Sequence, residues 1–404
     1  MDGPEPEVPG LQNRLQASQS KPRRMKTKTM KNIFKFISGA LFVALVAIGA
    51  CNSNTTPGQI QIGMLAPLTG NGASFGISQR DGVQLALDEI NAKGGINGLK
   101  LELIVEDTKT EPPTAVTATN KLISQNKVPV IIGSAASLDV PAYMDLLEKA
   151  HVPQILPVAV LPKITEGDAK WTFRSAMNDK IAATKMAEFV VNELQAKKVA
   201  ILLEDSAFGS TGMVFGERLE QLGVKPLTVE KFKRGDLDMS AQLIKIKNLG
   251  ATHIQFWGYY ADYAQIARQM KDLGVHAQLM GNQAPVTEKT IELGGEAVEG
   301  VIDICLFVPT SEDPKIKSFT DNFRAKYNRL PDTWAAQSYD GMYILAEALR
   351  QGGTDPQKIR DALAATKDFN GITGTITFNS KGDAEFRGTS VVVVRQGRFV
   401  PYKN

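Results

Sequence analysis

Short apolar segments alternate with longer segments of helical periodicity along most of this chain, and this alternation restricts its fold more than any other feature. The segments with strand character are residues 60–65, 101–105, 128–132, 199–203 and 253–257. Between them, apolar residues recur at helical spacing, and the helical stretches stop at glycines such as Gly94, Gly223 and Gly274. Strands that alternate with helices build parallel sheets covered on both faces. We therefore predict an α/β protein with doubly wound parallel sheets.

The alternating pattern occurs in two successive runs, from about residue 59 to 173 and from about 179 to 302. An extended segment follows each run, at 171–174 and at 305–309. Two further helical stretches come next, and the chain ends in predicted strands at 376–378, 391–394 and 398–400. The two runs predict two lobes, and the extended segments predict the places where the chain passes between them.

The charge is unevenly distributed along the 404 residues, whose formal net charge is +3. The segment before Cys51 contains eight basic and three acidic residues, so the remainder of the chain has a net charge near −2. Nucleic-acid binding requires a dense basic face. The composition therefore excludes nucleic acid as a partner of the folded part, while a hydrophobic content of 43% excludes disorder.

The basic excess belongs to a targeting segment. Basic residues between 21 and 35 precede an apolar run at 36–48, which is too short for a permanent membrane span. The following Gly49-Ala50-Cys51 resembles a bacterial lipobox, in which the cysteine thiol is lipidated after cleavage. We expect residues 1–50 to be an extension plus a lipoprotein signal peptide, and residues 51–58 to be a tether. A buried cysteine in an uncleaved helix is the alternative, and Met25 and Met30 are alternative starts.

Signals for catalysis or cofactor binding are weak. Cys305, the only cysteine besides Cys51, is expected to be a small apolar residue in a buried strand without a disulfide partner. The three histidines are far apart, so we expect no metal site. The glycines of 70–76 imitate a dinucleotide-binding turn, but their spacing is wrong and Pro67 separates them from the strand. We predict no cofactor and no enzymatic activity.

Three segments carry a resemblance to a known family. Residues 63–70 (GMLAPLTG), 88–98 (DEINAKGGING) and 131–134 (IIGS) resemble type I periplasmic binding proteins, in particular the branched-chain amino-acid-binding group that serves ABC importers. The resemblance covers residues 59–404. It implies two lobes joined by three hinge crossings, the third near 371–375, which close on a small-molecule ligand. A membrane permease and its ATPase would be the partners, and we expect a monomer.

With these crossings, lobe 1 comprises residues 59–176 and 305–370, and lobe 2 comprises residues 177–304 and 371–404. The resemblance also assigns candidate ligand-binding positions. Ser137 corresponds to a serine that holds the ligand carboxylate, although it could instead cap its own helix. The remaining positions are backbone groups or side chains that line the cleft in the family: Val158, Ala159, Val160, Phe75, Phe208, Tyr259, Gln283 and Trp334.

Two positions depart from the pattern of amino-acid binders. Val160 replaces a threonine or serine, and Gln283 replaces the acidic residue that pairs with the ligand ammonium. A buried ammonium without a carboxylate partner costs several kcal/mol. We therefore expect a carboxylate-bearing ligand that lacks the α-amino group, unless Glu204 or Asp205 replaces the missing acid. A ligand-sensing receptor module for a signalling partner is the alternative function.

Overall fold

The structure is a computed structural model, and it describes residues 58–206, 208–387 and 389–403. Cys51, the predicted lipidation site, and the predicted signal segment lie outside the described residues. Within the described part of the chain, the helices are all too short or too polar to cross a bilayer.

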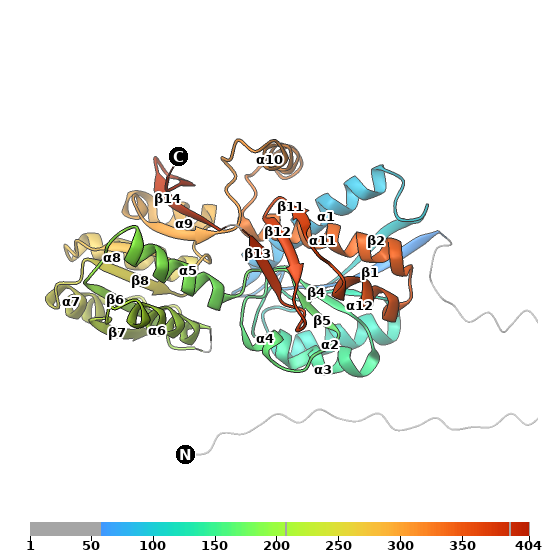
Figure 1. Cartoon of the computed structure of the whole chain (residues 1–404), viewed down its shortest axis with the longest axis horizontal. Coiled ribbons are helices and arrows are strands. Elements are labelled where there is room, and N and C mark those ends of the chain that lie inside the picture. The colour runs from blue at the N-terminus through green and yellow to red at the C-terminus, as the bar shows by residue number, and fades with distance from the viewer. Residues whose placement is uncertain (1–57, 207, 388, 404) are drawn as a thin grey trace, which may run out of the picture. The chain divides into compact units, whose positions relative to one another are not determined.

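Lobe 1 is built on a five-stranded parallel sheet with the strand order β2-β1-β3-β4-β5. Its strands are β1 (Gln59–Ala66), β2 (Lys100–Asp107), β3 (Ile131–Ile132), β4 (Gln154–Leu156) and β5 (Thr172–Arg174). Its helices are α1 (Ala73–Ala92), α2 (Pro112–Lys121), η1 (Leu122–Asn126), α3 (Val140–Ala150), α4 (Lys163–Glu166), α10 (Pro314–Tyr327), α11 (Thr333–Gly352) and α12 (Pro356–Ala364). Figure 1 shows α2 and α3 together on one side of this sheet and α11 on the other.

Lobe 2 is built on a seven-stranded sheet with the order β15-β14-β10-β9-β8-β6-β7. Its strands are β6 (Val199–Glu204), β7 (Thr228–Phe232), β8 (His253–Trp257), β9 (Gln278–Met280), β10 (Ile302–Cys305), β14 (Ser390–Arg395) and β15 (Arg398–Pro401). Its helices are α5 (Asp179–Asn192), η2 (Gly209–Gly212), α6 (Met213–Gln221), α7 (Ser240–Asn248), α8 (Tyr260–Asp272), α9 (Glu288–Gly294) and η3 (Gly295–Val298). Strands β6 to β10 are parallel, whereas β14 and β15 are antiparallel additions at one edge.

The period-two pattern of the strands explains why helices cover both faces of each sheet. In β6, Val199, Ile201 and Leu203 pack in one core cluster with α5 and α6. Ala200 and Leu202 point to the opposite face and pack in a second cluster with α7 and α8. Because both faces of the strand are apolar, both must be covered by helices. The predicted doubly wound α/β fold is confirmed.

Three segments connect the lobes, but the third lies later in the chain than predicted. The first leads from β5 to α5 and the second from β10 to α10. A small antiparallel sheet of β11 (Phe369–Gly371), β12 (Gly374–Phe378) and β13 (Ala384–Arg387) precedes the third. Ile376, Phe378 and Ala384 pack in the core of lobe 1 with α1 and α11.

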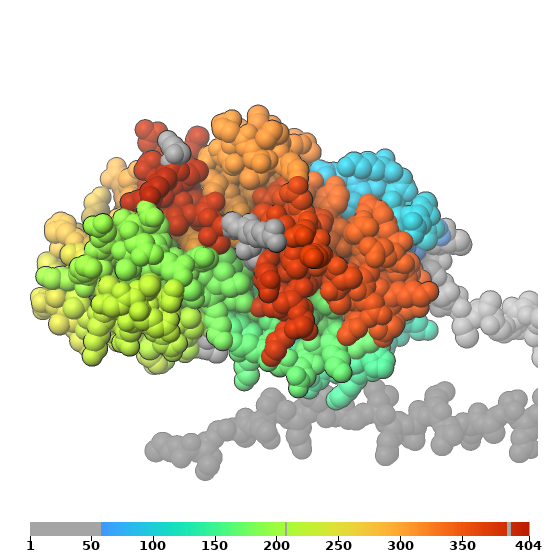
Figure 2. Space-filling model, in the orientation of Figure 1, coloured from blue at the N-terminus to red at the C-terminus, as the bar shows by residue number. Residues whose placement is uncertain are grey.

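The prediction that residues 371–387 belong to lobe 2 is therefore wrong. The third crossing lies between β13 and β14, because only β14 and β15 join the sheet of lobe 2. Figure 1 shows β14 beside α9, and β11 and β12 beside α11. Figure 2 shows the same division on the surface, where the last segments of the chain occupy two separate areas.

Candidate functional site

A small pocket lies where the two lobes meet, and we call it the ligand pocket. Most of its lining residues follow the carboxyl end of a parallel strand, which is where open α/β sheets bind ligands. The lining residues from lobe 1 are Asn71, Gly72, Phe75, Thr110, Ala135, Ala136, Ser137, Val158, Val160 and Trp334. Those from lobe 2 are Phe208, Arg234, Tyr259 and Ala284. The pocket encloses about 40 Å³.

Ser137 lies in the loop between β3 and α3 and is 8% exposed. It does not cap α3, because that helix begins at Val140 with Asp139 at the N-cap position. Its Oγ instead accepts a hydrogen bond from the backbone N–H of Val160 at 3.0 Å. Since the oxygen is the acceptor in that bond, the Ser137 hydroxyl proton can be donated to another group. Ser137 thus ties the loop after β3 to the loop after β4 at the pocket wall.

The structure separates the three predicted residues after β4. Val158 and Val160 line the pocket, whereas Ala159 packs in the core cluster of lobe 1 with Leu156 and Tyr143. The backbone of Val160 is occupied on both sides, because its N–H binds Ser137 and its carbonyl accepts from the Asp179 N–H at 3.1 Å. We had expected the backbone of residues 158–160 to face the ligand. In this arrangement Val160 contributes its apolar side chain to the pocket instead.

All four predicted aromatic residues line the pocket and contact one another across the lobes. Phe75 lies with its ring centroid 5.6 Å from that of Tyr259 and 5.6 Å from that of Trp334. Phe208 contacts Tyr259 at 4.9 Å. Trp334 Nε1 is buried and has no hydrogen-bond partner among the described residues. The wall therefore combines an apolar aromatic surface with one indole N–H donor.

Gln283 does not line the pocket, although its neighbour Ala284 does. It is 1% exposed and has a positive φ of 69°. Its Nε2 donates to Met177 O at 3.2 Å and to Asp179 Oδ1 at 3.3 Å. Both partners are acceptors, which fixes the orientation of the amide. The side chain thus joins lobe 2 to the first crossing segment, and its predicted contact with ligand stays a prediction.

Two buried carboxyl groups hold Gln283 from opposite sides. The backbone N–H of Gln283 donates to Asp303 Oδ1 at 2.6 Å, and its side chain binds Asp179. Burial raises the pKa of Asp179 to about 7, although hydrogen bonds from Gln283 and Thr211 oppose that shift. Burial likewise raises the pKa of Asp303 to about 7. Both groups are therefore expected to gain protons near neutral pH.

Arg234 is a pocket residue that sequence reasoning missed. It follows β7, and its guanidinium carbon lies 4.0 Å from the ring centroid of Tyr259. Its Nη2 and Nε donate to the two carboxylate oxygens of Glu204 at 2.7 and 3.1 Å. Glu204 is 2% exposed, whereas the side chain of Arg234 is 29% exposed. The carboxylate thus lies behind the guanidinium, which faces the pocket.

Glu204 and Asp205, the two acidic residues that could have compensated for a glutamine at position 283, are already paired with cationic side chains. Glu204 binds Arg234, and Asp205 binds Lys231 Nζ at 2.8 Å on the exposed surface. None of the described residues that line the pocket is Asp or Glu. The pocket also receives helix N-termini, since Gly72 and Tyr259 are the N-cap residues of α1 and α8. These features make the pocket favourable for a negatively charged group.

Residues 72–76 also form a G-x-S-x-G pattern, which is typical of the nucleophile turn of hydrolases. Ser74 lies in the first turn of α1, and its Oγ has no hydrogen-bond partner among the described residues. A nucleophilic serine requires an adjacent base. This pattern therefore does not form a catalytic arrangement in the structure.

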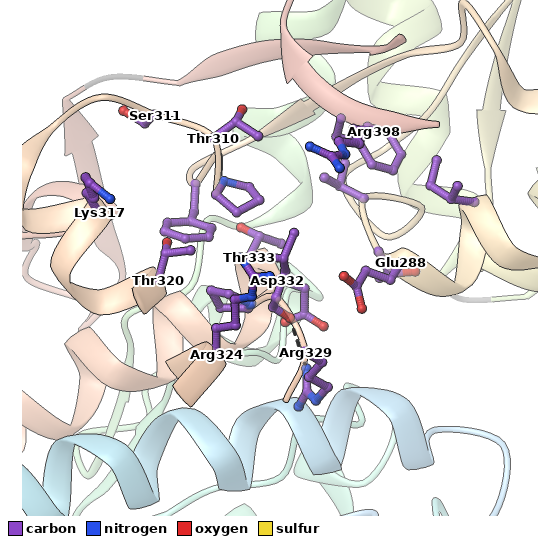
Figure 3. Close-up of a pocket in the computed structure, with 18 of the residues that line it drawn as sticks. Glu288, Thr310, Ser311, Lys317, Thr320, Arg324, Arg329, Asp332, Thr333 and Arg398 are labelled. Atoms are coloured by element: carbon purple, nitrogen blue, oxygen red, sulfur yellow. Dashed lines mark hydrogen bonds between the residues drawn. The ribbon is translucent and has the colours of Figure 1, made fainter. Parts of the chain in front are cut away.

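A larger cavity of about 750 Å³ lies between the start of α9 and α10 (Figure 3). Charged side chains of both signs line it, including Glu288, Arg324, Arg329 and Arg398, as Figure 3 shows. Arg329 is paired with Asp81 at 2.8 Å. Because this cavity contains none of the predicted binding residues and has no consistent charge, the smaller pocket is the candidate site.

Comparison with known proteins agrees with this geometry. Residues 59–397 match a family described as periplasmic binding proteins. A leucine-, isoleucine-, valine-, threonine- and alanine-binding protein of Pseudomonas aeruginosa is 29% identical over 345 residues, which cover 85% of this chain and 92% of the relative. An amino-acid-binding protein of the same organism is 30% identical over 357 residues, covering 86% and 93%.

Solved structures show the same fold. A leucine-binding protein from Thermotoga maritima aligns with a TM-score of 0.78 and 29% identity, over 85% of this chain and 97% of that chain. A substrate-binding protein of a branched-chain amino-acid transporter from Streptococcus pneumoniae, in complex with isoleucine, aligns with a TM-score of 0.77 and 30% identity, over 84% and 97%.

Proposed function

Because the chain belongs to the periplasmic binding protein family, we propose that it holds a small carboxylic acid without an α-amino group between its lobes. It is a substrate-binding protein of the branched-chain amino-acid type of ABC transport. Its relatives are solute-binding proteins rather than enzymes, and its family implies export to the periplasm. The proposal concerns which class of ligand the pocket accepts.

The chemical character of the pocket wall supports an acid over an amino acid. An ammonium group buried in the pocket would need a carboxylate partner, and the described lining residues provide none. Arg234 and the helix N-termini favour a carboxylate instead. The absence of Asp and Glu among the described lining residues, together with the guanidinium, is the observation that carries the proposal. The competing ligand is a branched-chain amino acid, which the names of the relatives favour.

Ligand entry requires the lobes to separate. The free volume of the pocket is about 40 Å³, which is room for only a few water molecules, since each needs about 10–15 Å³ of such volume. A ligand of several heavy atoms would therefore need the wall to move apart. Because the wall comes from both lobes, rotation about the three crossing segments would enlarge the pocket, and closure around the ligand would form the surface that a permease recognises.

Matched ligands that differ only in the amino group test the proposal. We expect 4-methylpentanoate and 3-methylbutanoate to raise the melting temperature more than leucine and valine, because a ligand that binds only the folded state stabilises it. Isothermal titration would then give the dissociation constants. A strong shift with leucine or valine and none with the deaminated acids would contradict the proposal.

We also propose that the mature protein is a monomer anchored by lipid at Cys51 and serving a permease and its ATPase. Metabolic labelling with an alkyne fatty acid should mark the wild-type protein and not Cys51→Ser.

The alternative role, a receptor module for a signalling partner, makes a different prediction for transport. Uptake of the identified ligand should be lost on deletion of the gene if the protein serves an importer, and should persist if it only reports the ligand.

A further inference from the structure

We infer that Arg234 selects ligands that carry a second acceptor oxygen at the end remote from the carboxylate, so that dicarboxylic or hydroxycarboxylic acids are preferred over simple fatty acids. The inference rests on the proposed function, because it concerns the same pocket. The inference goes beyond the proposed function by identifying the residue that distinguishes one small acid from another.

The position of Arg234 is fixed by two contacts rather than left to a flexible side chain. The bidentate pair with Glu204 holds one edge of the guanidinium, and the ring of Tyr259 supports its face. Burial of Arg234 lowers its pKa, but the Glu204 carboxylate and Tyr259 together outweigh this effect, so the pKa is raised. The group therefore stays charged at every physiological pH. An arginine held in this way loses little further conformational entropy when it binds a ligand.

Glu204 occupies only part of the hydrogen-bonding capacity of Arg234. It accepts from Nε and Nη2, whereas a guanidinium has five N–H groups, so further N–H groups remain on Nη1 and Nη2. The side chain of Arg234 is 29% exposed and lines the pocket, whereas Glu204 is 2% exposed. A carboxylate or hydroxyl oxygen is the chemical group that such donors recognise.

Ser137 and Arg234 contribute donors from different lobes. Ser137 belongs to the loop after β3 of lobe 1, and Arg234 to the loop after β7 of lobe 2. A ligand with an acceptor at each end can bind both side chains at once, with its middle part against the aromatic rings of Phe75 and Tyr259. A fatty acid with a methyl end would leave these Arg234 donors to water and would lack one hydrogen bond to a charged group.

The test compares acids that differ only at the far end. Isothermal titration would measure valerate against 5-hydroxyvalerate and glutarate, hexanoate against 6-hydroxyhexanoate and adipate, and benzoate against 4-hydroxybenzoate and terephthalate, with leucine and valine included. We expect at least one two-ended acid to bind about 10- to 100-fold tighter than its one-ended match, which corresponds to one hydrogen bond to a charged group. The hydroxy and dicarboxylic members distinguish a neutral from a charged second group.

Two variants assign the preference to Arg234. Arg234→Met should reduce this preference, measured as the ratio of the two dissociation constants within each matched pair, to less than about threefold. Because this variant leaves Glu204 buried and unpaired, the double variant Arg234→Met/Glu204→Met removes both partners and should give the same loss in a stably folded protein. Lys231→Met is the matched control, because Lys231 pairs with Asp205 on the exposed surface of the same region. It should keep the full preference.

The outcomes separate this inference from the proposed function. If simple acids bind and no two-ended acid is preferred, or if the preference survives in the double variant, Arg234 is not the selecting residue and the acid-binding proposal stands. If leucine or valine binds more tightly than every acid without an amino group, both are wrong. If no member of the panel binds, the inference is also overturned, since none of the small two-ended acids is recognised.

Discussion

At the scale of single residues, the titration of Asp303 makes the stability of lobe 2 depend on pH. Asp303 is fully buried, accepts hydrogen bonds from the N–H groups of Gln283 and Ile304, and has a pKa of about 7 because of burial. The unfolded carboxyl has its ordinary value near 4. Between these values the folded state binds more protons, so stability decreases as the pH rises from about 4 to 7.

Asp303→Asn should remove this contribution, because the amide oxygen can still accept both bonds and cannot ionise. Relative to wild type, the variant should become more stable as the pH rises from 5 to 8, by on the order of 2–4 kcal/mol. Chemical denaturation of both proteins at the two pH values measures the change. Asp179 titrates in both proteins, so it cancels in the difference. A difference between the proteins that does not vary with pH would show that Asp303 stays ionised.

Ser137 acts at the same scale on affinity. Ser137→Ala removes the hydroxyl donor and leaves the buried N–H of Val160 without its partner, so affinity for a tested acid should fall by about 10- to 100-fold. Stability should fall by about 1–3 kcal/mol. Ser137→Thr retains the hydroxyl and should recover most of both. Titration and thermal melting give the two values, and unchanged affinity in the alanine variant would remove Ser137 from the site.

At the scale of elements, the contact between α1 and α11 positions the pocket wall. Gly82 lies at a close approach of the two helices, since a Cβ at this position would lie 2.1 Å from Ala335 O. Gly82→Ala should cost about 1–3 kcal/mol by overpacking. The displacement of α11 should also weaken ligand binding, because Trp334 is in its first turn.

Gly167→Ala is the matched control for that substitution, because a Cβ there has no neighbour within 4 Å. Its melting temperature and ligand affinity should equal those of the wild type. Equal melting temperatures for Gly82→Ala and Gly167→Ala would mean that the two helices can separate without loss of core packing.

The same scale shows what could be predicted from sequence. The strands β1, β6 and β8 were predicted closely, because long apolar runs between helical stretches leave few alternatives. The strand character of β12 was also recognised, but its lobe was assigned wrongly. Alternation of apolar residues shows that Ile376 and Phe378 face a core, and it does not show which core. That choice depends on packing against α1 and α11, which are distant in sequence.

At the scale of the molecule, the candidate site could also be predicted only in part from the sequence. The aromatic residues and Ser137 were identified through the family resemblance, and all of them except Trp334 follow strands whose carboxyl ends converge at one edge. Arg234 was missed because its role depends on Glu204 at the end of β6 and Tyr259 at the start of α8, which are 30 and 25 positions away. No local pattern marks an arginine that is paired on one side and faces a pocket on the other.

A buried ion pair joins the end of β5, where the first crossing begins, to the turn before β13, and it leads to a prediction for the whole molecule. Arg174 is fully buried and forms a bidentate pair with Asp383 at 2.7 and 2.8 Å. Asn178, which caps α5 in lobe 2, also donates to Asp383 at 2.6 Å. Asp383 thus connects the end of β5, the start of α5 and the turn before β13.

Asp383→Ala leaves the Arg174 guanidinium buried without its partner, which should cost about 3–5 kcal/mol in the free energy of unfolding. Lys317→Met is the control, because its pair with Asp321 is more than 60% exposed on both sides and should contribute about 0–1 kcal/mol. The first crossing begins beside Asp383, and β13, the last strand before the third crossing, follows it directly, so small-angle scattering of the variant without ligand should show a broader distribution of lobe separations than the wild type. An unchanged unfolding free energy and scattering profile would mean that the hinge does not depend on this pair.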